Sequence, residues 1–273
     1  AVLIEGPKWC GKTTTASQLA NSILRMQDPS MRDEYLVTAK TKPSILLNGD
    51  TPRLIDEWQD APMLWDAVRT TVDDRQIPGQ FILTGSNAVD KSQIHHSGAG
   101  RITRLRMLPM SLWESKESTG EVSLKELFNN PDYDIDGKMS KMSIEDLIFA
   151  ASRGGWPASL LARTPKAQLL VAKNYVQTIC LDDISGIDGK RRDAKLTSMI
   201  LRAYARNVST LVKKKSLIDD VISSGEVSCH TDTFDDYVSA LEKLFVLQSV
   251  SAWCPAIRSK TAIRSSVKRC FCD

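Results

Sequence analysis

The stretch GPKWCGKTTT, residues 6–15, decides the fold that this sequence predicts, because it has the spacing of a phosphate-binding loop. Four residues separate Gly6 from Gly11, and Lys12 and Thr13 follow at once, which gives the pattern G-x-x-x-x-G-K-T. In such a loop the backbone N–H groups point inward at phosphates, the lysine reaches the terminal phosphates, and the hydroxyl holds Mg²⁺. The predicted nucleotide-binding residues are therefore Gly6, Pro7, Lys8, Trp9, Cys10, Gly11, Lys12, Thr13 and Thr14.

The flanks of this loop have the residue types that the pattern requires, a strand in front and a helix behind. Residues 1–4, AVLI, form a short apolar run that is typical of a buried strand. Behind the loop, residues 14–26 place apolar side chains at helical spacing, which predicts a helix whose positive end faces the phosphates. The alternative is an ordinary glycine turn in front of a helix.

The composition is that of a globular protein. The 273 residues are 42% hydrophobic, which allows a sizeable core and favours about two domains. No run approaches the ~18 apolar residues of a membrane span and no signal peptide opens the chain, so we expect a cytoplasmic protein. The net charge of +3 is too small to indicate a polyanionic partner. Six cysteines without a C-x-x-C pair favour reduced structural thiols over a metal site.

A second motif supplies the acidic residues that a triphosphate-binding loop needs. Residues 53–57, RLIDE, predict a strand that ends in two carboxylates. We expect Asp56 to hold Mg²⁺ together with Thr13, and Glu57 to orient or deprotonate an attacking water. The alternative is a strand end followed by the first turn of a helix, where the helix dipole favours acids.

A third motif places hydroxyl groups at the end of another strand. Residues 80–86, QFILTGS, are followed by Asn87, and Thr84, Ser86 and Asn87 are candidates to contact a γ-phosphate. Taken alone, a strand that runs into T-G-S is a common turn. Further elements are predicted as a strand over 45–47 and a helix over 61–72. Strands that alternate with helices predict a parallel sheet, whose ligands lie at the carboxyl ends of the strands.

Arg101, in the stretch GAGRI, is a candidate phosphate-sensing arginine, supplied within the subunit or to a neighbouring subunit. A role for a neighbour would make the protein a homo-oligomer. A plain surface arginine is the equal alternative. The predicted catalytic group thus comprises Lys12, Asp56, Glu57, Ser86 and Arg101.

The chain divides into four predicted segments. Residues 1–112 form the nucleotide-binding core, and the polar residues 113–142 form a linker or insertion. A helical lid over 143–208 begins at Ser143, which is a good N-cap. Residues 209–273 predict a winged-helix-like segment and the truncated start of a C-terminal domain.

The winged-helix prediction rests on two short helices followed by a β-hairpin. The helices are expected over 216–222 and after the capping residue Thr231, and the hairpin begins over 246–252. The last helix exposes acids that would repel a phosphate backbone, namely Asp232, Asp235, Asp236 and Glu242. A basic tail favours DNA instead, through Arg258, Lys260 and Arg264.

Several stretches together resemble the prokaryotic AAA-type ATPases that carry a C-terminal domain of unknown function. They are GPKWCGKTTT, LIDEWQ, FILTGS, GRITRLRMLPMSL, GGWP and IRSKTAIRSSVKR, and the resemblance runs nearly end to end. It implies an α/β P-loop NTPase fold of the AAA+-like, additional-strand type, a three-layer sandwich followed by a lid and a winged helix. Lys12, Thr13, Asp56 and Glu57 match the nucleotide and hydrolysis residues of the group, and Arg101 matches its G-R segment.

Length is the point at which the chain departs from this group. Full-length members continue into a region similar to restriction-type nucleases, whereas this sequence ends at Asp273. The chain also lacks an initiator methionine, so we expect a fragment truncated at both ends, and no nuclease activity is carried over.

Three functions are compatible with these motifs. The first is a Mg²⁺-dependent ATPase with ATP and Mg²⁺ as cofactors. The second is a nucleotide-gated DNA-binding or regulatory protein that contacts DNA or a protein partner through its C-terminal segment. The third, a small-molecule kinase, is disfavoured because kinases do not need the Asp56-Glu57 pair and no acceptor pocket is recognisable.

Overall fold

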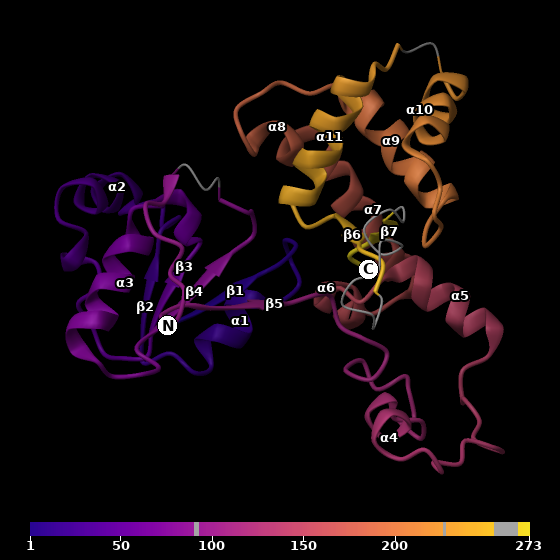
Figure 1. Ribbon diagram of the computed structural model, residues 1–273, viewed down its shortest axis with the longest axis horizontal. Helices are drawn as coiled ribbons and strands as arrows, with labels where there is room; N and C mark the ends of the chain where they lie inside the picture. The colour runs from indigo at the N-terminus through magenta and orange to yellow at the C-terminus, as the bar shows by residue number, and fades with distance from the viewer. Residues whose placement is uncertain (90–92, 226–227, 254–266) are drawn as a thin grey trace. The chain divides into compact units, whose positions relative to one another are not determined.

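The computed structural model describes residues 1–89, 93–225, 228–253 and 267–273. The chain forms two compact units (Figure 1), one of Ala1–Leu108 with Gln177–Cys272 and one of Pro109–Val176 with Asp273. No helix in these described ranges has the length and apolar character that a bilayer crossing requires.

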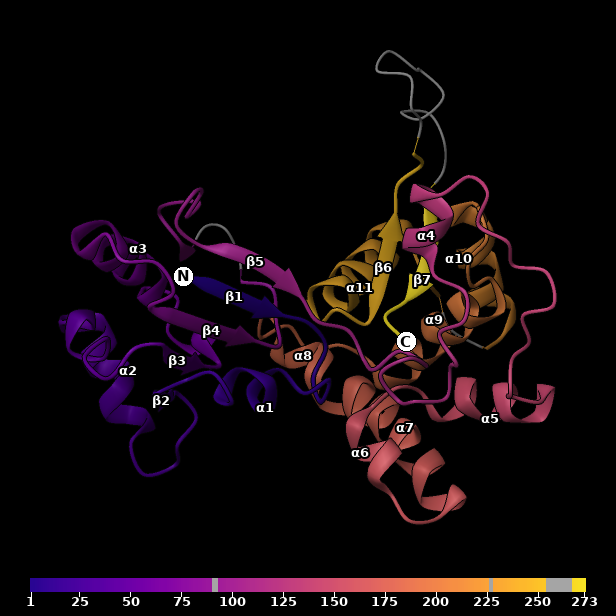
Figure 2. The same cartoon turned by 90° about the horizontal axis from the view of Figure 1, so that it is seen from below.

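The first unit is built on a five-stranded parallel sheet with the order β2-β3-β4-β1-β5. The strands are β1 (Val2–Glu5), β2 (Ser22–Arg25), β3 (Arg53–Asp56), β4 (Phe81–Gly85) and β5 (Thr103–Arg106). Asp56 lies opposite Thr84, and Glu5 lies opposite both Gly85 and Arg106. Figure 2 shows β1, β4 and β5 running in one direction from the end that holds the N-terminus. The predicted parallel α/β sheet is therefore confirmed, and its carboxyl edge collects the ends of all three motifs.

Helices cover both faces of the sheet, because successive strand residues point to opposite sides. They are α1 (Lys12–Ser17), α2 (Arg32–Thr41) and α3 (Leu64–Arg75). On one face, Ala16 of α1 packs against Leu54 and Ile82. On the other face, the neighbouring strand residues Ile55 and Leu83 pack with Trp65 of α3. This alternation produces the predicted three-layer sandwich.

Two predicted elements are wrong, and a third has shifted bounds. Instead of one helix over 14–26, α1 ends at Ser17 and β2 follows, because Ile23 and Leu24 pair with β3. Apolar residues at this spacing suit a strand as well as a helix, and pairing with the sheet decides. The predicted strand over 45–47 begins instead as a short 3₁₀ helix, η1 (Pro43–Ile45). The helix predicted over 61–72 is α3, which follows a second 3₁₀ turn, η2 (Trp58–Asp60).

The C-terminal part of the first unit is mainly helical. Its elements are the π-helical turn η4 (Ile179–Asp183), α8 (Ile184–Gly186), α9 (Ala194–Arg206), α10 (Lys214–Ser223), α11 (Thr231–Lys243), β6 (Leu247–Val250) and β7 (Lys268–Phe271). The last two strands pair antiparallel, and the rings of Tyr204 and Phe234 stack between α9 and α11. The order of two helices and two strands matches the predicted outline, but the winged-helix assignment stays a prediction. Arg258, Lys260 and Arg264 lie outside the described residues.

The second unit contains α4 (Leu124–Asn129), α5 (Ile144–Arg153), α6 (Pro157–Leu161) and most of α7 (Pro165–Thr178). Ser143 is the N-cap of α5, as predicted, and forms a reciprocal capping box with Asp146. The buried Arg153 side chain makes a two-pronged ion pair with Glu117, at 2.8 and 3.0 Å. The predicted segment limits at 112, 142 and 208 stay predictions.

Candidate functional site

The loop from Gly6 to Lys12 leaves the end of β1 and enters α1, as the motif requires. Its two glycines are needed for different reasons. A Cβ atom on Gly6 would lie 2.0 Å from the carbonyl oxygen of Met107, so the loop passes tightly against the chain that follows β5. Gly11 is the N-cap of α1 and has φ of 100°, a left-handed backbone conformation that residues other than glycine rarely adopt. The loop is therefore tightly curled.

Lys12 turns its side chain back into this curl and is 5% exposed. Its Nζ donates to the carbonyl oxygens of Pro7 at 2.7 Å and Gly6 at 3.0 Å. Burial lowers the pKa of Lys12, and the nearby Cys10, Glu57 and Asp56 oppose that shift. The ammonium group is thus held at the centre of the loop by neutral oxygens, which an anion can replace as partners.

Thr13 and Asp56 meet at the carboxyl edge of the sheet. Oδ1 of Asp56 accepts hydrogen bonds from Oγ1 of Thr13 at 2.7 Å and from Oγ1 of Thr84 at 2.6 Å. No lysine, arginine or histidine of the described ranges forms an ion pair with Asp56. A hydroxyl and a carboxylate whose charge has no direct partner are ligands that suit Mg²⁺, which takes one or two protein oxygens beside phosphate and water. The residues present therefore fit the predicted cation.

Glu57 follows Asp56 with φ of 55°, a left-handed conformation that is uncommon outside glycine. Its Oε2 accepts a hydrogen bond from Oγ of Ser86 at 3.1 Å and another from Nε2 of Gln59. Ser86 thus donates to Glu57, and its contact with a γ-phosphate stays a prediction. Sequence reasoning missed Gln59, although it stands two positions after Glu57 in the LIDEWQ stretch.

Lys8 points away from the loop centre and forms an ion pair with Asp183 of η4, at 2.6 Å. The Lys8 side chain is 39% exposed, whereas that of Asp183 is 10% exposed. Sequence reasoning did not find Asp183, because 175 positions separate it from Lys8 and no motif surrounds it. The other predicted loop residues differ in exposure, since Cys10 is buried while Trp9 and Thr14 are exposed.

Arg101 lies at the amino end of the parallel strands, opposite the carboxyl end where the phosphate-binding loop begins. Its carbonyl oxygen accepts from the N-terminal amine of Ala1, at the start of β1, while the loop leaves the other end of that strand. The guanidinium Nε is 2.7 Å from Oδ1 of Asp73 on α3. The expectation that Arg101 reaches a phosphate of its own subunit is therefore wrong, because a whole strand separates the two. A role toward a neighbouring subunit stays a prediction.

Comparison with known families matches both parts of the chain. An AAA domain family matches residues 1–116, and a domain of unknown function, DUF8612, matches residues 144–273. No curated protein matches the sequence significantly. The two matches confirm the resemblance that the motifs indicated.

Several solved structures are similar to this chain at low sequence identity. The Walker-type ATPase PABY2304 of Pyrococcus abyssi has a TM-score of 0.51 and 12% identity, over 100% of this chain and 88% of that chain. A variant of RuvB from Thermotoga maritima has a TM-score of 0.36 and 18% identity, over 99% of this chain and 83% of the RuvB chain. The Aeropyrum pernix Orc1 protein in complex with DNA has a TM-score of 0.29 and 10% identity, over 99% of this chain and 82% of the Orc1 chain. The first of these supports the P-loop ATPase fold.

Proposed function

Since the chain is an AAA-type protein with a C-terminal domain of unknown function, we propose that it is a Mg²⁺-dependent ATPase. The observation that carries this proposal is the pair of hydrogen bonds that Asp56 accepts from the hydroxyls of Thr13 and Thr84, at 2.7 and 2.6 Å. This group follows a curled loop that holds the buried Lys12. The reaction is the hydrolysis of ATP to ADP and phosphate.

In this proposal the loop from Gly6 to Thr14 binds the phosphates through its backbone N–H groups and Lys12. The Lys12 ammonium exchanges the carbonyl oxygens of Gly6 and Pro7 for phosphate oxygens. Because phosphate oxygens carry negative charge and carbonyl oxygens do not, this exchange adds a charge–charge attraction to the ammonium and favours nucleotide binding.

Thr13 and Asp56 hold the cation. Thr84 keeps Asp56 oriented, because its hydroxyl donates to the same Oδ1 atom that accepts from Thr13. A Mg²⁺ ion held by Thr13 and Asp56 would neutralise the negative charge that develops on the phosphates during hydrolysis.

Glu57 is the proposed base that orients and deprotonates the attacking water. Ser86 and Gln59 donate to one of its carboxylate oxygens and thereby fix the side chain next to Asp56. Both donors are neutral, so they position the carboxylate without neutralising it.

Substitution Glu57→Gln tests the proposed hydrolysis. We expect phosphate release to fall by about 100-fold or more, since a general base contributes roughly 10²–10⁴. ATP affinity, measured by fluorescence with a labelled nucleotide, stays unchanged because Lys12 and the loop remain. The matched control is Glu145→Gln on the exposed start of α5. Turnover that persists in Glu57→Gln would remove Glu57 from this role.

A nucleotide-gated DNA-binding or regulatory protein is the second candidate. The acids of α11 that argue against DNA are partly neutralised, since Asp235 pairs with Lys214 and Asp236 pairs with Lys190 and Arg192. A gel shift on duplex DNA over a range of salt concentrations tests it. Binding that is unaffected by loss of Arg258, Lys260 and Arg264 would reject the basic tail as the contact.

A further inference from the structure

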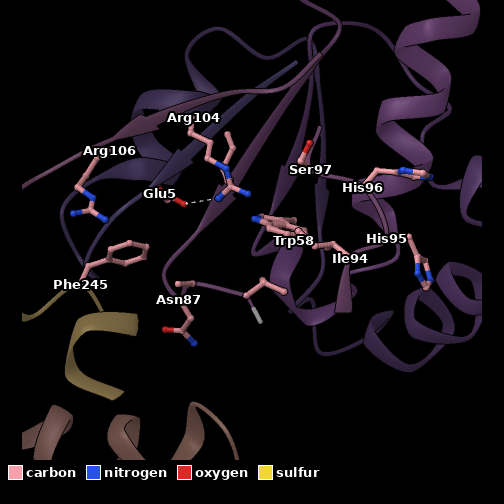
Figure 3. Close-up of a pocket in the computed structure, with 13 residues that line it drawn as sticks. Glu5, Trp58, Asn87, Ile94, His95, His96, Ser97, Arg104, Arg106 and Phe245 are labelled. Carbon is pink, nitrogen blue, oxygen red and sulfur yellow. Dashed lines mark hydrogen bonds and ion pairs between the residues drawn. The ribbon is translucent and has the colours of Figure 1, made fainter. Parts of the chain in front are cut away.

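A cavity of about 510 Å³ lies on the sheet face opposite α1, beside the edge strand β5 (Figure 3). Its walls come from β1, β5, residues 87–89 and 94–97 after β4, and Phe245 just after α11. This volume is within the range of small-molecule sites. No step of the proposed hydrolysis uses the cavity.

Two arginines of β5 give the cavity a positive wall. Arg104 and Arg106 are two positions apart, so both side chains leave the same face of the strand. Nη1 of Arg104 is 3.3 Å from Oε2 of Glu5, and its guanidinium lies 4.9 Å from the ring centre of Trp65. Arg106 lies 5.0 Å from the ring centre of Phe245, and no carboxylate of the described residues pairs with it.

The rest of the lining is apolar or able to donate hydrogen bonds. Figure 3 shows the two arginines on the strand side and Ile94, His95, His96 and Ser97 on the other side. Leu3, Ile94 and Phe245 supply apolar surface, while the serine and histidines supply polar groups. Glu5 is the single carboxylate among the described residues of the lining, so two guanidinium groups exceed the one described acid that faces them.

Protection of a sheet edge is the simpler explanation for charges on β5, since charged side chains discourage pairing with another strand. That explanation accounts for exposed arginines on an edge strand. It does not require a cavity of ligand size, or an unpaired guanidinium against an aromatic ring on its wall. A group that carries negative charge and an apolar part satisfies both features.

We propose that this cavity binds a small organic anion, with its phosphate or carboxylate on Arg106 and Arg104 and its apolar part against Leu3, Ile94 and Phe245. The site is separate from the phosphate-binding loop and lies on the other face of β1. Its occupation does not need Lys12. A carboxylate or phosphate on a guanidinium gains paired, charge-assisted hydrogen bonds, which a surface lysine does not offer in that geometry.

The test uses phenyl phosphate, inorganic phosphate and phenol as probes, with binding followed by ligand-observed NMR titration. We expect phenyl phosphate to bind the Lys12→Ala variant as well as the wild-type chain. Because each probe fragment supplies only one of the two interactions, inorganic phosphate and phenol bind about tenfold more weakly.

Substitution Arg106→Ala is expected to weaken phenyl phosphate binding by about tenfold or more, since it removes a charge-assisted hydrogen bond. Arg106→Lys keeps the charge and gives an intermediate affinity, while Lys40→Ala, at the exposed end of α2 and outside the cavity lining, has no effect. Thermal unfolding of each variant confirms that it is folded. The proposal is overturned by absence of saturable binding, by loss of binding in Lys12→Ala, or by an equal effect of Lys40→Ala.

Discussion

Two carboxylates at opposite edges of the same sheet have opposite environments. Asp73, near the amino edge, is paired with Arg101 at 2.7 Å and with Arg69 at 3.1 Å. The carboxylate of Asp56, at the carboxyl edge, accepts hydrogen bonds from two hydroxyls of the described residues, those of Thr13 and Thr84. The charge of Asp73 is neutralised by arginines of the protein, whereas that of Asp56 has no such ion pair among the described residues. This difference supports the proposal that a metal and a triphosphate bind at the carboxyl edge.

The largest expected effect is the loss of ATP affinity when Lys12, in the loop at the carboxyl edge, is replaced. Substitution Lys12→Ala removes the charge held inside the loop, and we expect ATP affinity to fall by about 100-fold. Equilibrium titration with a fluorescent nucleotide measures this loss. Lys40→Ala, at the exposed end of α2, is the control and leaves ATP affinity unchanged. Equal losses of affinity in the two variants would show that Lys12 has no specific part in nucleotide binding.

The second expected effect concerns a third carboxylate, Asp183, which Lys8 neutralises at 2.6 Å. Substitution Lys8→Ala leaves a nearly buried charge without this partner, and we expect the free energy of unfolding to fall by about 1–3 kcal/mol. Chemical denaturation measures the change. The double variant with Asp183→Asn recovers most of the lost stability, because the unpaired charge is then absent. If the double variant is no more stable than Lys8→Ala, the ion pair does not carry the effect.

A smaller effect is expected from Thr84, one of the two hydroxyl donors to Asp56. Substitution Thr84→Ala frees Asp56 to rotate, and we expect hydrolysis to slow by about tenfold, near the lower end of what one hydrogen bond to a charged group contributes. Thr84→Ser keeps the hydroxyl and restores the rate, which separates orientation of Asp56 from packing of the strand. A steady-state phosphate assay is the measurement. Equal rates in Thr84→Ala and the wild type would show that Thr84 does not orient Asp56.

The smallest effect is expected at the amino edge. The hydrogen bond from Arg101 lowers the pKa of Asp73 below its usual value. The pair therefore stabilises the fold above the usual pKa of an aspartate, about 4, and this contribution is lost as pH falls through the lowered pKa. Arg101→Ala should make the midpoint of thermal unfolding less dependent on pH in this acidic range. An unchanged pH profile would contradict the pairing.

Much of the carboxyl edge could be predicted from sequence, because parallel strands end at the same edge and each strand ended in a recognisable polar group. Thr13, Asp56 and Thr84 meet there as a consequence. The same reasoning failed for Arg101, since a residue that precedes a strand lies at the other edge. It also failed for β2, where the apolar spacing of Ile23 and Leu24 fits either a helix or a strand. The Lys8–Asp183 ion pair joins residues 175 positions apart, so no local sequence motif could predict it.

The central claim is that Asp56, unlike Asp73, is left for a divalent cation. The most direct measurement is ATP affinity with and without Mg²⁺ in the wild type, Asp56→Asn and Asp73→Asn. We expect Mg²⁺ to strengthen ATP binding by about tenfold in the wild type and in Asp73→Asn, and to have no effect in Asp56→Asn. The claim would be contradicted by an ATP affinity that does not change with Mg²⁺ in the wild type, or that still changes with Mg²⁺ in Asp56→Asn.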